Sequence, residues 1–135
     1  MKDLHIRSVS SEDKSFTNFM MIWEDEVDEI FPHFDKDNID MAEISILNAD
    51  DQDIGVFMAE YKGEELHVVV DYVIPEYRDI GVGEEYFAQK IEDYKKMGFK
   101  NIVALTDDAK HREYLTRCGF QNSAKHNDLF ELGLN

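Results

Sequence analysis

The strongest constraint on how this chain folds is one run, residues 66–74, which reads Leu-His-Val-Val-Val-Asp-Tyr-Val-Ile. An apolar run of this length predicts a central strand that is buried on both faces. The segment after it carries Gly81 and Gly83, and beyond them apolar residues recur at helical spacing as far as Gly98. The sequence therefore predicts a strand, a glycine-bearing loop and a helix in direct succession.

Shorter patterns on both sides of this unit predict the remaining elements. Apolar residues at helical spacing predict one helix over residues 12–31, which ends at Pro32. Ser10 or Ser11 is the expected N-cap of that helix. Strands are expected at residues 4–9, 43–48, 54–61, 101–105, 120–123 and 129–132, and a further helix, capped by Asp107 or Asp108, runs to Cys118. The order β-α-β-β-β-α-β-α-β-β, with two parallel crossovers late in the chain, predicts one α/β (α+β) domain over residues 1–135 with a mixed sheet.

The loop ahead of the second helix has the features of an anion site. Glycines let a backbone approach a phosphate closely, and the free N–H groups of a first helical turn point toward it. Arg78 would add one cationic donor. The same two glycines also fit a plain strand-to-helix turn that binds nothing, and these residues alone leave both interpretations open.

Two motifs are similar to those of one protein family. Arg78-x-x-Gly81-x-Gly83 resembles the pyrophosphate-binding motif of the GNAT (GCN5-related N-acetyltransferase) superfamily. Downstream, the stretch Tyr114-Leu-Thr-Arg-Cys-Gly-Phe120 resembles the family's Phe-Tyr-x-x-x-Gly-Phe. The resemblance implies a GNAT-like mixed central sheet of about six to seven strands with three or four helices.

The resemblance also implies a cofactor and a reaction. The cofactor would be acetyl-coenzyme A, and an amine would attack its thioester directly, which makes the chain an acyl-CoA-dependent N-acyltransferase. The backbone N–H near Val73 would act as the oxyanion donor. The implied cofactor-binding residues are Val73, Arg78, Asp79, Ile80, Gly81, Val82 and Gly83.

The general base has several candidates, of which Asp71 is the first. Strand alternation predicts that Asp71 and His67 lie on the same face as Val73. Glu60 and Glu65 flank the preceding turn. Any of these four side chains is a candidate to take the proton of the amine, directly or through water. Asp71 equally fits a structural carboxylate that is solvated or capped by a backbone N–H.

Other residues depart from the family pattern. Leu115 stands where the family often has a tyrosine that protonates the leaving thiolate, and Asp79, Glu84 and Glu85 bring negative charge to the phosphate loop. These residues favour an alternative, a catalytically impaired GNAT-like binding or structural module. The spacing Asp108-x-x-His111-x-x-Tyr-Leu also resembles a variant of small phage-encoded acetyltransferase-like proteins.

Net charge limits the possible partners. The chain carries 30 acidic and 14 basic residues, a formal charge of −16. Such a surface repels nucleic acid and anionic membranes and attracts cations. We therefore expect an amine acceptor, small or protein-borne and cationic. Because no apolar run resembles a signal peptide or could span a bilayer, we expect a cytoplasmic protein, and as its oligomeric state a monomer or homodimer. A third interpretation, an acidic nucleic-acid mimic that inhibits a DNA-binding partner, depends on charge alone.

Two further expectations concern metal and the acceptor side. One cysteine and five histidines without ligand spacing predict no metal site. The helix 12–31 and the loop 32–40 are where the resemblance implies the acceptor pocket. Its candidate lining residues are Trp23, Phe31 and Phe34, with Glu24 or Asp28 at the rim, although Trp23 and Phe31 also fit plain core positions.

Overall fold

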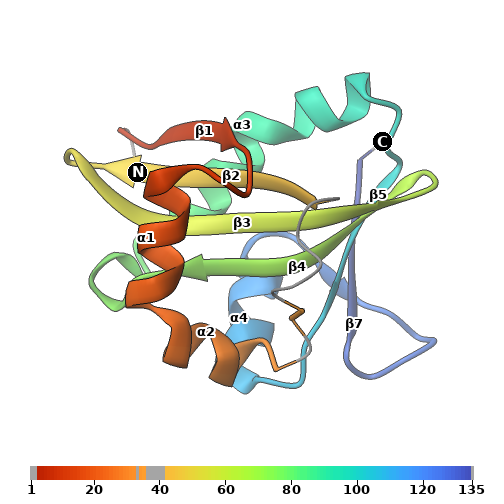
Figure 1. Cartoon of the computed structure of the whole chain (residues 1–135). Helices are drawn as coiled ribbons and strands as arrows, with labels where there is room; N and C mark the ends of the chain where they lie inside the picture. Colours follow the sequence, from red (N-terminus) through yellow and green to blue (C-terminus); the bar gives the residue numbers. More distant parts are fainter. Residues whose placement is uncertain (1–2, 33, 36–41, 135) are drawn as a thin grey trace.

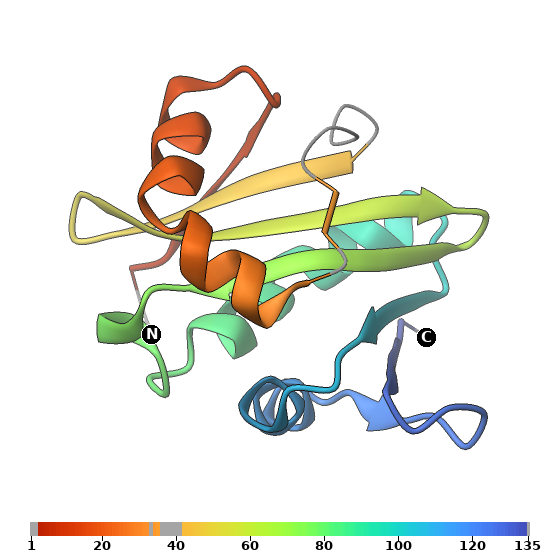
Figure 2. The ribbon, with the colours of Figure 1, turned by 60° about the horizontal axis from the view of Figure 1, so that its bottom comes forward.

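The structure is a computed structural model that describes residues 3–32, 34–35 and 42–134. Seven strands form one sheet in the order β1-β2-β3-β4-β5-β7-β6. Helices α1 and α2 cover one face of this sheet, and α3 and α4 lie on the other (Figure 1). In Figure 2, α2 follows α1 along the chain and passes in front of β4.

The helices and strands follow the predicted order. The strands are β1 (His5–Val9), β2 (Ala42–Ala49), β3 (Gln52–Lys62), β4 (Glu65–Val73), β5 (Asn101–Leu105), β6 (Gln121–Asn122) and β7 (Leu129–Gly133). The helices are α1 (Lys14–Ile22), α2 (Glu24–Ile30), α3 (Val82–Lys96) and α4 (Ala109–Arg117), and a short 3₁₀ turn, η2, covers Pro75–Tyr77. The mixed α/β fold class is confirmed.

The first helix differs from its prediction. It is divided at Trp23, whose ψ of 14° ends α1 and begins α2. The N-cap is Asp13 instead of Ser10 or Ser11, since the Asp13 carboxylate accepts the N–H of Phe16 at 3.1 Å. The break turns the chain so that α2 leaves the direction of α1 and reaches the region of α4 (Figure 1).

Both predicted parallel crossovers are present. Helix α3 connects β4 to its parallel neighbour β5. Helix α4 connects β5 to β6, but β7 lies between these two strands and pairs antiparallel with each. The last strand therefore fills the position between the strands that α4 joins.

Aromatic side chains attach the helices to the sheet. Phe57 of β3 packs against Tyr86 and Phe87 of α3, with ring centroids 4.6 and 5.8 Å away. On the opposite face, Tyr72 of β4 packs against Phe19 of α1, with ring centroids 6.1 Å apart.

In the described part of the chain, no helix is both long and apolar enough to cross a membrane.

Candidate active site

The site begins where β4 separates from β5. The two strands pair from Glu65 with Asn101 as far as Val68 with Ala104, and β4 then continues alone on that side to Val73. The separation coincides with a β-bulge, because Val70 pairs with Met58 and Val68 with Ala59, which leaves Val69 without a counterpart on β3. From Val69 to Val73, β4 therefore has no strand partner on the side of β5, and this unpaired side of β4 is called the gap below.

Backbone groups of β4 point into this gap. Ile74, just after the strand, donates its N–H to the carbonyl of Ile54 at 2.8 Å, so this group faces β3. Hydrogen-bonding direction alternates along a strand, which turns the N–H groups of Asp71 and Val73 toward the gap. The carbonyl of Val73 agrees with this direction, since it accepts a hydrogen bond from Arg78 Nε at 2.8 Å.

The glycine loop leads into the N-terminus of α3. Asp79 and Gly81 both have left-handed backbone, with φ of 65° and 87°. Gly81 is the N-cap and offers no side chain to the first turn, where Glu85 makes the first helical bond to the Gly81 carbonyl. The N–H groups ahead of that bond make no helical hydrogen bond, so they could donate to an anion.

The structure changes the reason for Gly83. We expected this glycine to let the backbone approach a phosphate. A Cβ atom at Gly83 would instead lie 2.2 Å from Cε2 of Tyr114 and 2.3 Å from its hydroxyl. The glycine therefore makes room for the tyrosine ring, whatever else the loop binds.

The two charged residues of the loop lie in unexpected contacts. Arg78 turns away from the N-terminus of α3: its guanidinium pairs with Glu26 of α2 at 2.5 Å and stacks over the Tyr72 ring at 5.1 Å. Asp79 pairs with Arg117 of α4 at 3.0 Å, which offsets its charge beside the loop. The cation beside the loop is therefore Arg117, which no spacing in the sequence indicated.

Asp71 has a partner that the sequence did not reveal. Its Oδ1 lies 2.5 Å from Nε2 of His111 in α4, and both side chains are buried. Burial opposes the charged form of His111, but the charge and the hydrogen bond of Asp71 outweigh burial and raise the pKa of the histidine. In the sequence, His111 is marked by the Asp-x-x-His spacing at residues 108–111, but this spacing does not predict a contact with β4.

The bulge at Val69 corrects the prediction for His67. Pairing with alternate residues of β3 places Asp71 and Val73 on one face, as expected, but His67 pairs with Glu60 and lies on the other face. The His67 ring lies 3.1 Å from Glu65. Of the strand residues proposed as base, Asp71 is thus the one that faces α4.

Helix α4 presents different side chains at positions 114 and 115. Leu115 is fully buried in the core, with 0% of its surface exposed. The Tyr114 ring stacks on His111, with centroids 5.7 Å apart. Burial and the nearby Asp71 carboxylate raise the pKa of Tyr114 well above its ordinary value, and burial raises the pKa of the Cys118 thiol to about 12.

A small cavity adjoins these groups. It measures about 10 Å³, and Asp71, Val73 and Tyr114 are among the residues that line it. A cavity of this size has room for about one water molecule. Polar groups of the candidate site therefore have space for a single bridging water.

On the acceptor side, the described residues are mainly packed. Phe31, at the end of α2, meets the His111 ring edge-on at 5.1 Å. Trp23 contacts Phe19 and Tyr72, so it belongs to the packing between α1 and β4. Most of the predicted acceptor loop 32–40, namely residues 33 and 36–40, lies outside the described residues.

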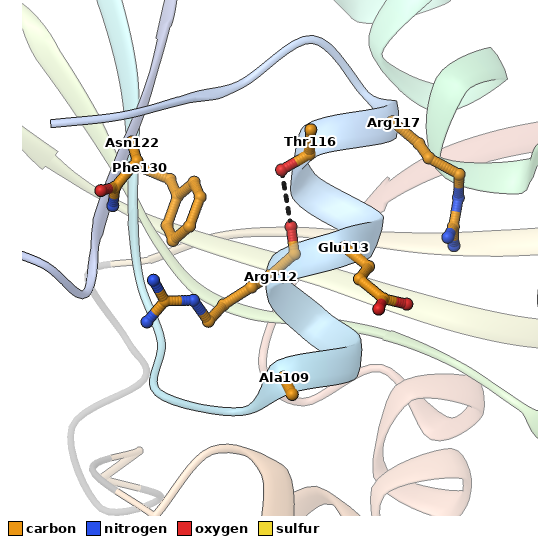
Figure 3. A pocket seen from close by; sticks show the side chains of 7 residues that line it. All are labelled: Ala109, Arg112, Glu113, Thr116, Arg117, Asn122 and Phe130. Atoms are coloured by element: carbon orange, nitrogen blue, oxygen red, sulfur yellow. Dashed lines mark hydrogen bonds between the residues drawn. The ribbon is translucent and has the colours of Figure 1, made fainter.

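A wider surface hollow, of about 660 Å³, lies on the other side of α4 (Figure 3). Arg112 lies over the Phe130 ring at 5.3 Å and pairs with Asp128 at 3.0 Å. None of the predicted site residues lines this hollow. Among the described residues, no group of three or more histidine, cysteine or acidic side chains is arranged to hold a metal ion.

Solved structures share the overall fold of this chain. The N-acetylglutamate synthase of Neisseria gonorrhoeae, in complex with coenzyme A and N-acetyl-glutamate, matches with a TM-score of 0.73 at 17% identity. That match covers 100% of this chain, which spans 36% of the synthase chain. The sequence matches no protein-family model and no curated protein.

Two other matches cover whole proteins of similar size. A GNAT family acetyltransferase from Elizabethkingia anophelis with acetyl-CoA bound has a TM-score of 0.70 at 16% identity, over 98% of this chain and 99% of that one. The PaiA N-acetyltransferase from Thermoplasma acidophilum, in complex with coenzyme A, has a TM-score of 0.72 at 14% identity, over 96% and 98%. These matches show that the chain, with its mixed sheet, has the GNAT fold.

Proposed function

We propose that this protein is an N-acetyltransferase that moves an acetyl group from acetyl-coenzyme A to an amine. The observation that carries the proposal is the gap after Val68 together with the uncapped N-terminus of α3. Tyr114 connects the two, because it lines the cavity with Val73 and its ring lies against Gly83. Three GNAT-fold neighbours were solved with coenzyme A or acetyl-CoA. At 17% identity or less, these neighbours support the fold, and the activity is our inference from the site.

The residues of the site fit coenzyme A. The first-turn N–H groups of α3 would hold its pyrophosphate, and Arg117 would add a cation beside the loop. The N–H groups of Asp71 and Val73 would bond to the pantetheine arm and polarise the thioester carbonyl. Bound there, acetyl-CoA supplies the activated acetyl group.

The acceptor that we propose is a cationic amine. The formal charge of −16 concentrates cations near the protein and lowers the local concentration of anions. The base that takes the amine proton would be the pair of Asp71 and His111, which is buried at the gap. A polyamine or a lysine side chain carries the required chemistry.

A shift of the melting temperature with millimolar acetyl-CoA tests the cofactor. Ligand at about 100 times its Kd stabilises a protein by about 2.7 kcal/mol. Two variants with the same charge change sharpen the test: Ile80→Glu in the loop and Met97→Glu at the far end of α3, where the native side chains are 50% and 53% exposed. The first should weaken the shift, and the second should not.

Turnover is then measured as free coenzyme A released in the presence of spermidine or a lysine peptide. Equal shifts in wild type and Ile80→Glu would contradict binding at the loop. Acetyl-CoA binding without turnover on any amine would favour the alternative, a binding module. One observation supports that alternative: Leu115 is buried and cannot protonate a thiolate.

A further inference from the structure

The pair of His111 and Asp71 leaves two polar atoms unused. Their side chains are 7% and 2% exposed. His111 Nδ1 and Asp71 Oδ2 are buried and have no hydrogen-bond partner among the residues that the structure describes. A buried polar atom without a partner costs free energy, and such atoms call for an explanation other than stability.

The contact with Asp71 determines which nitrogen of His111 is basic. A carboxylate accepts hydrogen bonds, so Nε2 carries the hydrogen and the neutral ring keeps its lone pair on Nδ1. Phe31 from α2 and Tyr114 hold the ring on two sides. Phe31 lies at the end of α2, on the side where we expect the acceptor, and Tyr114 touches Gly83 of α3. The His111 ring therefore lies between the acceptor side and the cofactor side of the site.

The groups that act on His111 come from two elements. Asp71 faces it from β4, and Asp108 lies at the start of its own helix, where its carboxylate accepts the His111 backbone N–H at 2.8 Å. Burial lowers the basicity of the ring, but the two carboxylates outweigh it and raise the pKa. The raised pKa of Tyr114 keeps that phenol neutral, and Phe31 carries no charge.

We propose that His111 is the catalytic base of this transferase and that Asp71 is a positioning residue that orients it. The inference rests on the proposed function and assigns the base within it. An imidazole is a stronger base than a carboxylate, and proton transfer is most efficient when the base has a pKa near the working pH. Asp71 thereby moves from candidate base to the group that fixes the tautomer.

The transfer begins with the loss of a proton from the substrate. The substrate ammonium gives one proton to His111 Nδ1 through a water molecule, which leaves a neutral amine and an imidazolium paired with Asp71. The amine nitrogen bonds to the acetyl carbon and the carbon–sulfur bond breaks. The sulfur leaves with the electron pair and receives the second amine proton through solvent, and His111 later returns its proton to solvent.

The test is the pH dependence of kcat in three variants. His111→Gln keeps a donor in the place of Nε2 but has no basic atom, so kcat should fall by about 10²–10⁴-fold and the acid limb should disappear. Asp71→Asn keeps an acceptor without charge, so the acid limb should persist and move to lower pH. His67→Gln is the matched control, since His67 also contacts a carboxylate but lies on the opposite face of β4.

Two further measurements separate this inference from folding and from the proposed function. Circular dichroism and the acetyl-CoA melting shift should be retained in each variant, and NMR of the His111 ring should show the pKa falling in Asp71→Asn. An active wild type whose His111→Gln form keeps its kcat and pH profile overturns the inference alone. Loss of turnover at every pH in Asp71→Asn, with His111→Gln active, makes Asp71 the base and also overturns it.

A wild-type chain that acetylates no amine refutes the proposed function, and the inference fails with it. Coenzyme A release from acetyl-CoA in the absence of amine is the blank for every rate. Because the histidine variants are compared at saturating acetyl-CoA, an effect on kcat is separated from an effect on cofactor binding.

Discussion

Gly83 and Tyr114 are in such close contact that a Cβ on the glycine would overlap the tyrosine ring, at 2.2 Å from Cε2. The contact connects the first turn of α3 to the middle of α4. A glycine in the phosphate-loop motif therefore has a packing role in this chain. A substitution at Gly83 tests this packing before it tests any phosphate.

We predict that Gly83→Ala lowers the free energy of unfolding by about 1–3 kcal/mol, the usual cost of overpacking. In a Tyr114→Leu background the same change should cost much less, because the ring is gone. Urea unfolding of the two single variants and the double variant measures this coupling. An equal cost in both backgrounds would show that the contact is not the cause.

Asp79 offers a way to change the charge of the loop without changing its backbone. Asparagine tolerates the left-handed conformation, so Asp79→Asn keeps φ near 65° and frees Arg117. Removing one like charge near a phosphate gains about 1 kcal/mol, so acetyl-CoA should bind several-fold more tightly at low salt. Titration calorimetry measures the affinity.

Glu92→Gln is the control for this prediction. Glu92 also forms an exposed ion pair, with Lys95 at 3.3 Å, in the last turns of α3. The same increase in both variants would mean that only the net charge of the chain matters.

The ion pair between Glu26 and Arg78 should give a defined acid dependence. Burial acts to raise the pKa of Glu26, but the hydrogen bond and the charge of Arg78 lower it below the ordinary value of 4.5. A lowered pKa in the folded state stabilises the protein at pH values above the ordinary pKa of the group. This stabilisation is lost as the pH falls through the folded-state pKa.

Glu26→Gln should therefore cost roughly 1 kcal/mol or less at neutral pH, since the pair is about one-third exposed. The difference from wild type should shrink as the solution is made acidic. Urea unfolding over a range of pH checks this, with the exposed Glu29→Gln on the same helix as the control. A difference that stays constant with pH would contradict the pKa shift.

Cys118 should be nearly inert in the native protein. With a pKa of about 12, roughly one thiol in 10⁴ is ionised at pH 8, and the thiolate is the reactive form. Iodoacetamide should label Cys118 quickly in urea and very slowly without it, as mass spectrometry would show. Native labelling at the rate of a free small thiol would disprove the burial of this group.

Much of the fold could be predicted from local patterns. The run at residues 66–74 and the glycines at 81 and 83 predict β4, the loop and α3, because each feature depends on neighbours in sequence. The division at Trp23 was missed, since apolar residues keep a helical spacing across it. A backbone break without glycine or proline leaves little trace in such a pattern.

The site was less accessible to prediction. Alternation places Asp71 and Val73 on one face, but it assumes an unbroken strand, and the bulge at Val69 puts His67 on the other. The contact of Asp71 with His111 spans 40 positions and depends on how α4 packs, which no spacing specifies. Tertiary contacts of this kind decide which of several acidic residues has a partner.

The short pairing between β4 and β5 divides the sheet into two parts. It extends from Glu65 with Asn101 to Val68 with Ala104, and it joins β1–β4 in one part to β5–β7 in the other. A force that pulls the two parts away from each other should break this short pairing before the longer pairing of β3 with β4. A ligand bound in the gap would contact both parts of the sheet and hold them together, so the stiffness of the whole sheet would depend on whether the ligand is bound.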